Sequence, residues 1–306
     1  MLCVGSSRLT FNCKKVMLAF APNWITMYIE TSFVIDDPTR ESKPQVSRGF
    51  RRRLENVVFQ FDVIYRLYLR LRYDASRASA PAHAILPNMV LQSRAEWREA
   101  CRIAQRLHLP LHRSPERNWD HVAAALAIAS TTSKDAYILD AGAEIYSNVL
   151  PALFVCGYCN LYGMNDSFAG LMRRGPIRYL PGNIARTGFP RASFDAITCM
   201  SMIEHGIPLG TYFREMFRLL KPGGVLITSA AYYPQSIDTQ NKTAHGAPIR
   251  VLSKPEAEAM IAQAEASGFE PTGDLNLECI RRPIRWEEHE LDYTLLIFTL
   301  RKPKPF

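Results

Sequence analysis

The sequence has little that could hold it together covalently or through a metal ion. Its seven cysteines are an odd number spread over 306 residues and give no disulfide framework, so we expect a reducing, cytoplasmic location. Cys156-Gly-Tyr-Cys159 is a lone CxxC without the second pair of a structural zinc site. His108 and His112 flank Pro110 and cannot share a helix face as metal ligands do. We therefore expect no metal.

Long uninterrupted apolar runs are also missing. Residues 14–35 begin with two lysines followed by apolar residues, as in a signal peptide, but Pro22, Asn23 and Glu30 interrupt the run. No small-x-small cleavage pattern follows it, and the run is too broken to cross a membrane. We expect an irregular terminus here, with export as the alternative.

Neither repeats nor low-complexity segments occur, and a hydrophobic content of 47% with 22% charged residues is that of a globular chain. The net charge of +8 is unevenly spread, because residues 1–80 hold 13 Lys and Arg against 7 Asp and Glu. This basic extension favours acidic partners such as anionic lipid or nucleic acid, and it says nothing about the fold.

Residues 50–77 combine arginines with apolar residues at helical spacing. Phe59, Val63, Leu67 and Leu71 recur every four residues and predict one apolar helix face. Two roles are open for this helix: it packs on the domain that follows, or it makes peripheral contact with an anionic membrane. Residues 78–87, rich in alanine and with two prolines, indicate a linker.

Two helices are predicted before residue 137. Ser93 and Glu96 match a capping box, so a helix should run from there to about Leu107. Residues 118–130 predict a second, amphipathic helix, with Asn118 or Asp120 near its start.

From residue 137 onwards, short apolar runs alternate with helical stretches. The runs are "AYILDAG", "CNLYGMN", "PIRYLPGN", "FDAITCMS" and "GGVLITSA". A helix over "KPEAEAMIAQAEASGF" and two strands over "DLNLECI" and "DYTLLIFTLRK" follow. This order predicts βα units and an α/β fold with a parallel sheet.

Two longer stretches resemble a known family. Phe189–Gly206, "FPRASFDAITCMSMIEHG", is similar to the fourth strand and following Glu-His of class I S-adenosylmethionine-dependent methyltransferases of the broad small-molecule, type 11-like group. Phe213–Ser229, "FREMFRLLKPGGVLITS", is similar to that family's next helix, Lys-Pro-Gly-Gly turn and fifth strand. The resemblance covers residues 137–301.

The resemblance implies a Rossmann-like, mostly parallel seven-stranded sheet flanked by helices, with an N-terminal helical extension. We expect three parts: a basic, partly helical extension (1–88), a helical lead-in or cap (89–136) and the methyltransferase domain (137–301). In such sheets the ligand binds outside the carboxyl ends of the strands, at the switch point of strand order. The implied cofactor is S-adenosylmethionine.

Asp140 and Gly142 match the first acid and first glycine of the family's Asp-x-Gly-x-Gly loop. A Cβ at Gly142 would obstruct close approach of the ligand. The later glycines are absent, since Glu144 and Tyr146 stand in this loop. We interpret Glu144 as an acceptor for the ammonium group of the ligand or for a helix N-terminus.

At the second strand end, Asn165 stands where the family has a ribose-binding acid, and Asp166 beside it can substitute. At the third, Gly182-Asn183 matches the family's Gly-Asp adenine contact. The resemblance adds three residues to the cofactor set: Ile184, Met200 and Ser201.

His205, just past the fourth strand, is the candidate catalytic acid or base, with a loop-holding role as the alternative. The predicted reaction moves a methyl group from S-adenosylmethionine to a small-molecule, sugar or glycolipid-type acceptor. The altered loop leaves open a catalytically degenerate binding or scaffold protein. Nucleic acid is the least favoured acceptor, because "CMSMIEHG" replaces an Asn/Asp-Pro-Pro-Tyr/Phe motif after strand four.

Overall fold

The computed structural model describes residues 58–59, 61–73, 86–240, 242–244 and 247–304. All of them belong to one compact unit, residues 48–306. The predictions made for residues 14–35, for residues 50–57 and 74–77 of the basic helix, and for residues 78–85 of the linker lie outside this described part.

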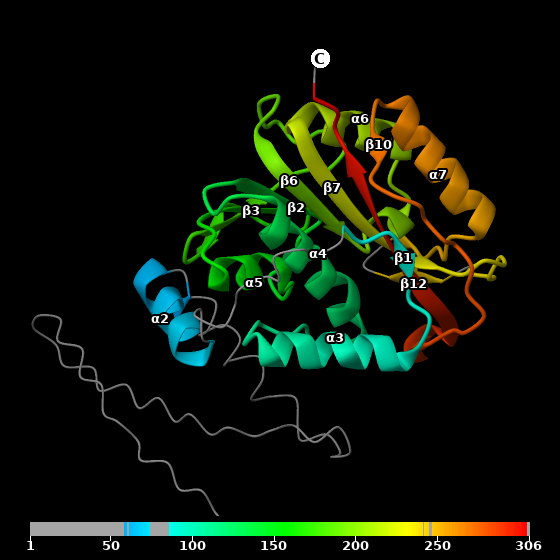
Figure 1. Cartoon of the computed structure of the whole chain (residues 1–306), viewed down its shortest axis with the longest axis horizontal. Coiled ribbons are helices and arrows are strands. Elements are labelled where there is room, and N and C mark those ends of the chain that lie inside the picture. The colour runs from blue at the N-terminus through cyan, green and yellow to red at the C-terminus, as the bar shows by residue number, and fades with distance from the viewer. Residues whose placement is uncertain (1–57, 60, 74–85, 241, 245–246, 305–306) are drawn as a thin grey trace, which may run out of the picture. The chain divides into compact units, whose positions relative to one another are not determined.

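A large mixed sheet forms the centre of the unit (Figure 1). Its strand order is β1-β12-β7-β6-β2-β3-β5-β4, and β10 and β11 also pair with β12. The strands are β1 (Met89–Val90), β2 (Tyr137–Ala141), β3 (Asn160–Asn165), β4 (Met172–Arg174), β5 (Ile177–Pro181), β6 (Phe194–Met200), β7 (Leu220–Tyr232), β10 (Glu270–Pro271), β11 (Ile284–Trp286) and β12 (Leu291–Arg301). A separate two-stranded sheet pairs β8 (Thr243–Ala244) with β9 (Ala247–Pro248).

The central strands β5, β3, β2, β6 and β7 are parallel, as the alternation of apolar runs and helices predicts. From β2 the chain proceeds to β3 and β5 on one side and then crosses to β6 and β7 on the other. The switch point of strand order therefore lies between β2 and β6. The Rossmann-like α/β prediction is confirmed.

The sheet has ten strands where seven were predicted. Four of them were not predicted: β4 pairs with β5 at one edge, and β1, β10 and β11 pair with β12 at the other. Three short strands share that edge: β11 pairs with Leu291–Tyr293, β1 with Leu296 and Ile297, and β10 with Leu300 and Arg301. Covering an edge strand in this way removes unpaired backbone groups.

The strand predicted over "DLNLECI" (residues 274–280) does not form. Side chains bond its carbonyl groups instead: Tyr232 Oη donates to Leu277 O at 2.6 Å, and Gln92 Nε2 donates to Glu278 O at 2.9 Å. These carbonyls are satisfied without a ladder, which is why an apolar alternation in the sequence gives a loop here.

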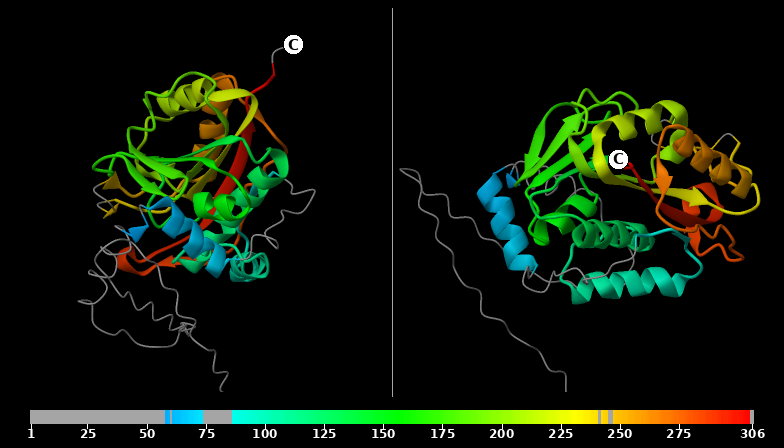
Figure 2. Two further views of the ribbon diagram at one scale, coloured as in Figure 1. Left: turned by 90° about the vertical axis from the view of Figure 1, so that its left-hand side faces the viewer. Right: turned by 45° about the horizontal axis from the view of Figure 1, so that its top comes forward.

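Helices cover both faces of the sheet (Figure 2). One core holds residues of α4 (Asn118–Thr131) and α5 (Val149–Val155), with α3 (Arg94–Arg106) and α2 (Asp62–Arg72) also contributing. The other core holds residues of α6 (Leu209–Leu219) and α7 (Lys254–Ala266). Alternate strand residues belong to opposite cores, for example Ile138 and Leu139 on β2. Short 3-10 turns η1 (Pro115–Arg117), η2 (Ile203–His205) and η3 (Glu287–His289) complete the fold.

The helix starts follow the predicted capping logic with one change. At α3 the Glu96 carboxylate accepts from the backbone N–H of Gln92 at 3.0 Å, one residue before the predicted cap Ser93. A complete capping box occurs at α7, where Ser253 and Glu256 bond each other's backbone and side chains. Gly268 (φ +98°) follows the end of α7.

Candidate functional site

The predicted cofactor residues lie in the last residues of β2, β3 and β6 or directly after β2, β3, β5 and β6, along the edge formed by the carboxyl ends of these strands. Backbone bonds join three of these ends: Gly142 N donates to Met164 O at 2.7 Å, and Gly182 N donates to Asn165 O at 3.2 Å. The structure therefore brings the first three strand ends into direct contact, with the end of β3 bonded to the loops that follow β2 and β5.

Asp140 lies at the centre of this edge and is only 2% exposed. Its Oδ1 accepts a hydrogen bond from Thr198 Oγ1 on β6 at 2.7 Å. Its Oδ2 is buried and has no hydrogen-bond partner among the described residues. Burial raises the pKa of Asp140 to about 6, although the Thr198 bond and the nearby His121 act to lower that pKa. A buried carboxylate oxygen without a partner suits a ligand that brings its own donor.

Gly142 adopts φ +89°, a conformation that a side chain disfavours. A Cβ built there would lie 2.2 Å from Cγ of Met202. The side chain that approaches this glycine is thus Met202, which follows β6. Methionine is flexible, so the space beside Gly142 is filled by a group that can move.

Glu144 and Asn165 meet above the β2 loop. Asn165 Nδ2 donates to Glu144 Oε1 at 3.5 Å and to Gly142 O at 3.4 Å. Asn165 Oδ1 accepts from Ser167 N at 2.9 Å, so one lone pair of this oxygen stays in the chain's own turn. Asp166, the predicted substitute for the ribose-binding acid, is exposed. Asn165 therefore ties the second strand end to the first.

Asn183 and Ile184 follow β5. Asn183 is exposed and its Oδ1 accepts from Ala185 N at 2.8 Å, while Ile184 is 7% exposed and belongs to the core shared with β2 and β6. The pair places an apolar and an amide group side by side at the third strand end. This is the chemistry that an adenine ring and its amine require.

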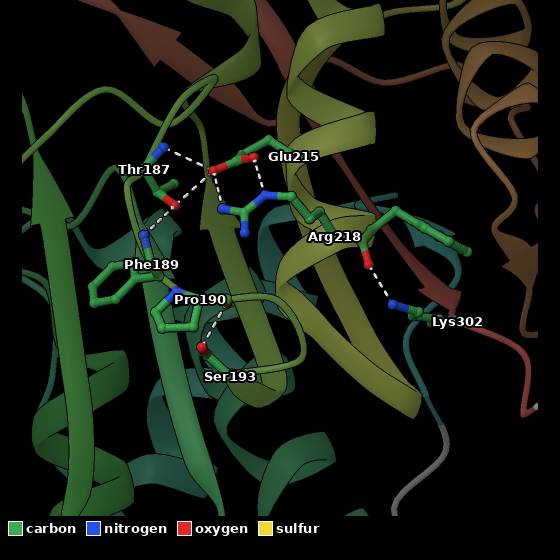
Figure 3. A network of polar contacts seen from close by, with 8 residues as sticks. Thr187, Phe189, Pro190, Ser193, Glu215, Arg218 and Lys302 are labelled. Atoms are coloured by element: carbon green, nitrogen blue, oxygen red, sulfur yellow. Dashed lines mark hydrogen bonds and ion pairs between the residues drawn. The ribbon is translucent and has the colours of Figure 1, made fainter.

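The loop after Ile184 is held on α6 by one carboxylate (Figure 3). Glu215 accepts from Thr187 N at 2.8 Å and Thr187 Oγ1 at 2.7 Å, and pairs with Arg218 through two bonds of 2.8 Å. The Arg218 bonds, helped by those of Thr187, lower the pKa of Glu215 to about 2, because all of them favour its ionised form. This network fixes the segment that leads from the predicted adenine contact.

Replacing Glu215 with glutamine should lower the free energy of unfolding at neutral pH by about 1–3 kcal/mol, since a charged acceptor of four bonds is lost. A carboxyl whose folded pKa is depressed stabilises the fold above its unfolded pKa, and this stabilisation is lost as the pH falls towards 2. Urea unfolding at pH 7 and at low pH measures the difference, which should shrink on acidification.

The matched control for that substitution is Glu99→Gln. Glu99 also pairs with two arginines at 2.8 Å, but on an exposed surface of α3 where ion pairs contribute little. Equal destabilisation by the two changes would contradict a special role for the Glu215 network.

The first turn of α4 lies against the ends of β6 and β7, a contact that the sequence did not predict. Asn118, Asp120 and His121 are all buried, so α4 is not the amphipathic helix that was predicted. Ser229 Oγ on β7 donates to Asp120 Oδ2 at 2.6 Å. His121 Nδ1 contacts Asn148 Oδ1 at 2.5 Å, just before α5. One feature of the sequence could have indicated this buried polar turn: the run Asn-Trp-Asp-His at the start of an alanine-rich helix.

Met200 and Ser201, predicted from the resemblance, lie beside this turn. Met200 is 9% exposed, and its sulfur is 3.7 Å from Ser229 Oγ. Ser201 has φ +52° and accepts from the guanidinium of Arg117 in η1. The end of β6 is thus joined to the helical cap by Arg117, which the sequence argument did not select.

Glu204, in η2, is another buried carboxylate of the site, besides Asp140 and Asp120. It is 3% exposed, its Oε1 accepts from Ala231 N at 3.4 Å, and its Oε2 has no hydrogen-bond partner among the described residues. Burial raises the pKa of Glu204 to about 7, and the positive charge of Arg117 opposes that rise. Such a group exchanges a proton near neutral pH.

His205 follows Glu204 and is half-buried. Tyr232, the last residue of β7, and Tyr233 after it both bond the loop of residues 274–280: Tyr232 Oη donates to Leu277 O at 2.6 Å and Tyr233 Oη donates to Ile280 O at 3.2 Å.

In the part of the chain that the structure describes, no cluster of three or more His, Cys, Asp or Glu could hold a metal ion. No helix within those same residues is long and apolar enough to cross a membrane.

Comparison with known proteins gives one family. Residues 139–228 match the family model described as a methyltransferase domain. The match begins in β2 and ends within β7, so it includes the carboxyl ends of β2, β3, β5 and β6. No curated protein matches the chain.

Several solved structures are similar to part of this chain. The [4+2]-cyclase SpnF is 18% identical over 61% of this chain and 84% of its own, with a TM-score of 0.45. An S-adenosylmethionine-dependent methyltransferase from Mesorhizobium loti is 17% identical over 60% and 97%, with a TM-score of 0.44. The 1,6-didemethyltoxoflavin-N1-methyltransferase of Burkholderia thailandensis, with substrate and S-adenosylhomocysteine bound, is 17% identical over 70% and 92%, with a TM-score of 0.43.

Proposed function

We propose that this chain, in which residues 139–228 match the model of a methyltransferase domain, moves a methyl group from S-adenosylmethionine to a small-molecule, sugar or glycolipid-type acceptor. The observation that carries the proposal is Asp140, a buried carboxylate with one oxygen left without a partner where the strand ends meet. The family match supports methyl transfer as the reaction class. The residues at the strand ends support this edge of the sheet as the cofactor site.

The residues at this edge fit the cofactor. When bound, S-adenosylmethionine supplies an electrophilic methyl group on a sulfonium sulfur. Asp140 would accept from the ammonium group, Asn165 and Glu144 from the ribose hydroxyls, and Asn183 with Ile184 would hold the adenine. Met202 must leave the space beside Gly142 as the site fills.

We assign to Glu204 the removal of a proton from the methyl acceptor. Methyl transfer depends mainly on alignment, but a hydroxyl or ammonium acceptor must also lose a proton. Glu204 would take that proton on its unpartnered Oε2, beside Arg117, which favours the ionised form. His205 stays a candidate for the same role.

A second function, a binding or scaffold protein without turnover, is favoured by two specific observations. Met202 fills the space beside Gly142, and the amide oxygens of Asn165 and Asn183 already accept bonds from their own turns.

The five cysteines in the described part form no disulfide, which supports a reducing, cytoplasmic location as a proposal.

The test is transfer of a labelled methyl group. The full chain is incubated with methyl-labelled S-adenosylmethionine and either a lipid extract or a water-soluble extract of cells. Label in an organic-soluble or sugar product, absent with Glu204→Gln, supports the proposal. Binding of S-adenosylhomocysteine without transfer to either extract would instead support the scaffold.

A further inference from the structure

Helix α2 (Asp62–Arg72) has two apolar sides, and only one of them is buried. Tyr65 is 4% exposed and Leu69 is 3% exposed, and both lie in the core formed with α4 and α5. The Arg66 guanidinium lies 5.3 Å from the ring centroid of Phe154 on α5. These contacts dock one side of α2 on the methyltransferase domain.

The opposite side carries large apolar side chains in solvent. Val63 is 75% exposed, Leu67 43% and Leu71 78%, at intervals of four residues, and Ile64 beside them is 38% exposed. At 100° per residue these four occupy an arc of about 100°, which is the width of a face that packs on something. Phe61, directly before the helix, is 60% exposed.

Exposed arginines lie outside this arc. At 100° per residue Arg70 lies about 20° beyond the margin at Val63, and Arg72 lies about 80° beyond the margin at Ile64. Arg72 lies over the rings of Tyr68 and Tyr73, with its guanidinium 5.8 Å and 5.9 Å from their centroids. The arrangement is an apolar stripe with one cation at its margin and a second farther round the helix.

The neighbouring strand continues the same chemistry. β4 packs against α2, and Arg174 of β4 lies 5.9 Å from the ring of Phe59. Leu171, directly before β4, is 60% exposed, and Arg173 on that strand is exposed as well. Apolar and basic side chains therefore gather around this end of the sheet.

We propose that α2 binds in the plane of an anionic lipid bilayer, with Val63, Ile64, Leu67 and Leu71 among the acyl chains and the arginines at the headgroups. A protein groove would also accept an apolar stripe. The basic residues favour lipid: Arg70 lies at the margin of the stripe, and the exposed Arg72 and Arg173 lie on the same helix and on the neighbouring strand. A helix lying in the interface brings cations beside its apolar face to the level of anionic headgroups. The surface is separate from the strand-end site, so it stands or falls independently of cofactor binding.

The test is co-sedimentation of the full chain with phosphatidylcholine vesicles that either contain or lack phosphatidylglycerol. The chain should bind the anionic vesicles at low salt and be released by salt. Leu67→Asp with Leu71→Asp should weaken binding at least about tenfold, because two leucines no longer enter the bilayer. Arg70→Glu should weaken binding at low salt more than at high salt.

Ile280→Asp is the matched control. Ile280 is 92% exposed but lies in the loop of residues 274–280, away from α2, so its change should leave vesicle binding unaltered. Absence of binding to anionic vesicles, or equal binding by wild type and the double leucine variant, would overturn the proposal. So would loss of thermal stability in the double variant with vesicle binding retained, since the stripe would then be covered by the protein itself.

Discussion

Replacing Asp140 with alanine should raise the dissociation constant for S-adenosylhomocysteine about 10- to 150-fold. The carboxylate is buried, Thr198 holds one oxygen, and the other has no partner among the described residues. A hydrogen bond to a charged group contributes about 1.5–3 kcal/mol, and the ammonium of the ligand would lose its acceptor. Calorimetric titration measures the loss.

Asp140→Asn separates this loss from misfolding. Burial raises the pKa of Asp140 from 3.8 to about 6, so the folded state retains a proton that the unfolded chain releases between these values. The free energy of unfolding therefore falls as the pH rises through this window, by about 3 kcal/mol once it is passed. Asparagine cannot ionise, so the variant should be more stable than wild type at pH 8 while binding weakly. A variant that binds as tightly as wild type would contradict the role of Asp140.

Replacing Glu204 with glutamine should lower kcat/KM by about 10²–10⁴-fold while leaving cofactor affinity unchanged. Only the ionised carboxylate accepts a proton, so wild-type activity should rise with pH through about 7, the pKa that burial gives Glu204. The glutamine variant should lack this rise. Measuring methyl transfer between pH 5 and pH 9, once the acceptor is known, gives both results.

Arg117→Gln tests the same assignment through its neighbour. The charges that face Glu204 are those of Arg117, which lowers its pKa, and Asp120, which raises it. Removing the arginine charge should therefore move the activity midpoint to higher pH. His205→Ala should leave that midpoint in place if Glu204 is the base. A midpoint that moves with His205 and is unaffected by Glu204 would reverse the assignment.

The parallel strands were predictable because each is a short apolar run bounded by turn residues. Phe194–Met200 is one example, and the motifs around it indicated the family directly. Asp140 and Gly142 could be placed at a strand end for the same local reason. Features that depend only on neighbouring residues, such as a strand or the residue at its end, could therefore be predicted from the sequence.

Contacts between residues far apart in the sequence could not be predicted in this way. Arg117 and Asp120 reach the site only because α4 lies with its first turn on the ends of β6 and β7. In α2, the four-residue spacing of Val63, Leu67 and Leu71 predicted a packing face, but Tyr65 and Leu69 are the buried pair. Both sides of α2 carry enough apolar residues to be buried. Which side is buried therefore depends on the surface of the domain that the helix contacts.

Calorimetric titration of the full chain with S-adenosylhomocysteine asks directly whether the strand ends around Asp140 bind the cofactor. We expect one site per chain with a micromolar dissociation constant, with binding weakened in Asp140→Ala and retained in His205→Ala. No detectable heat at millimolar ligand would contradict it.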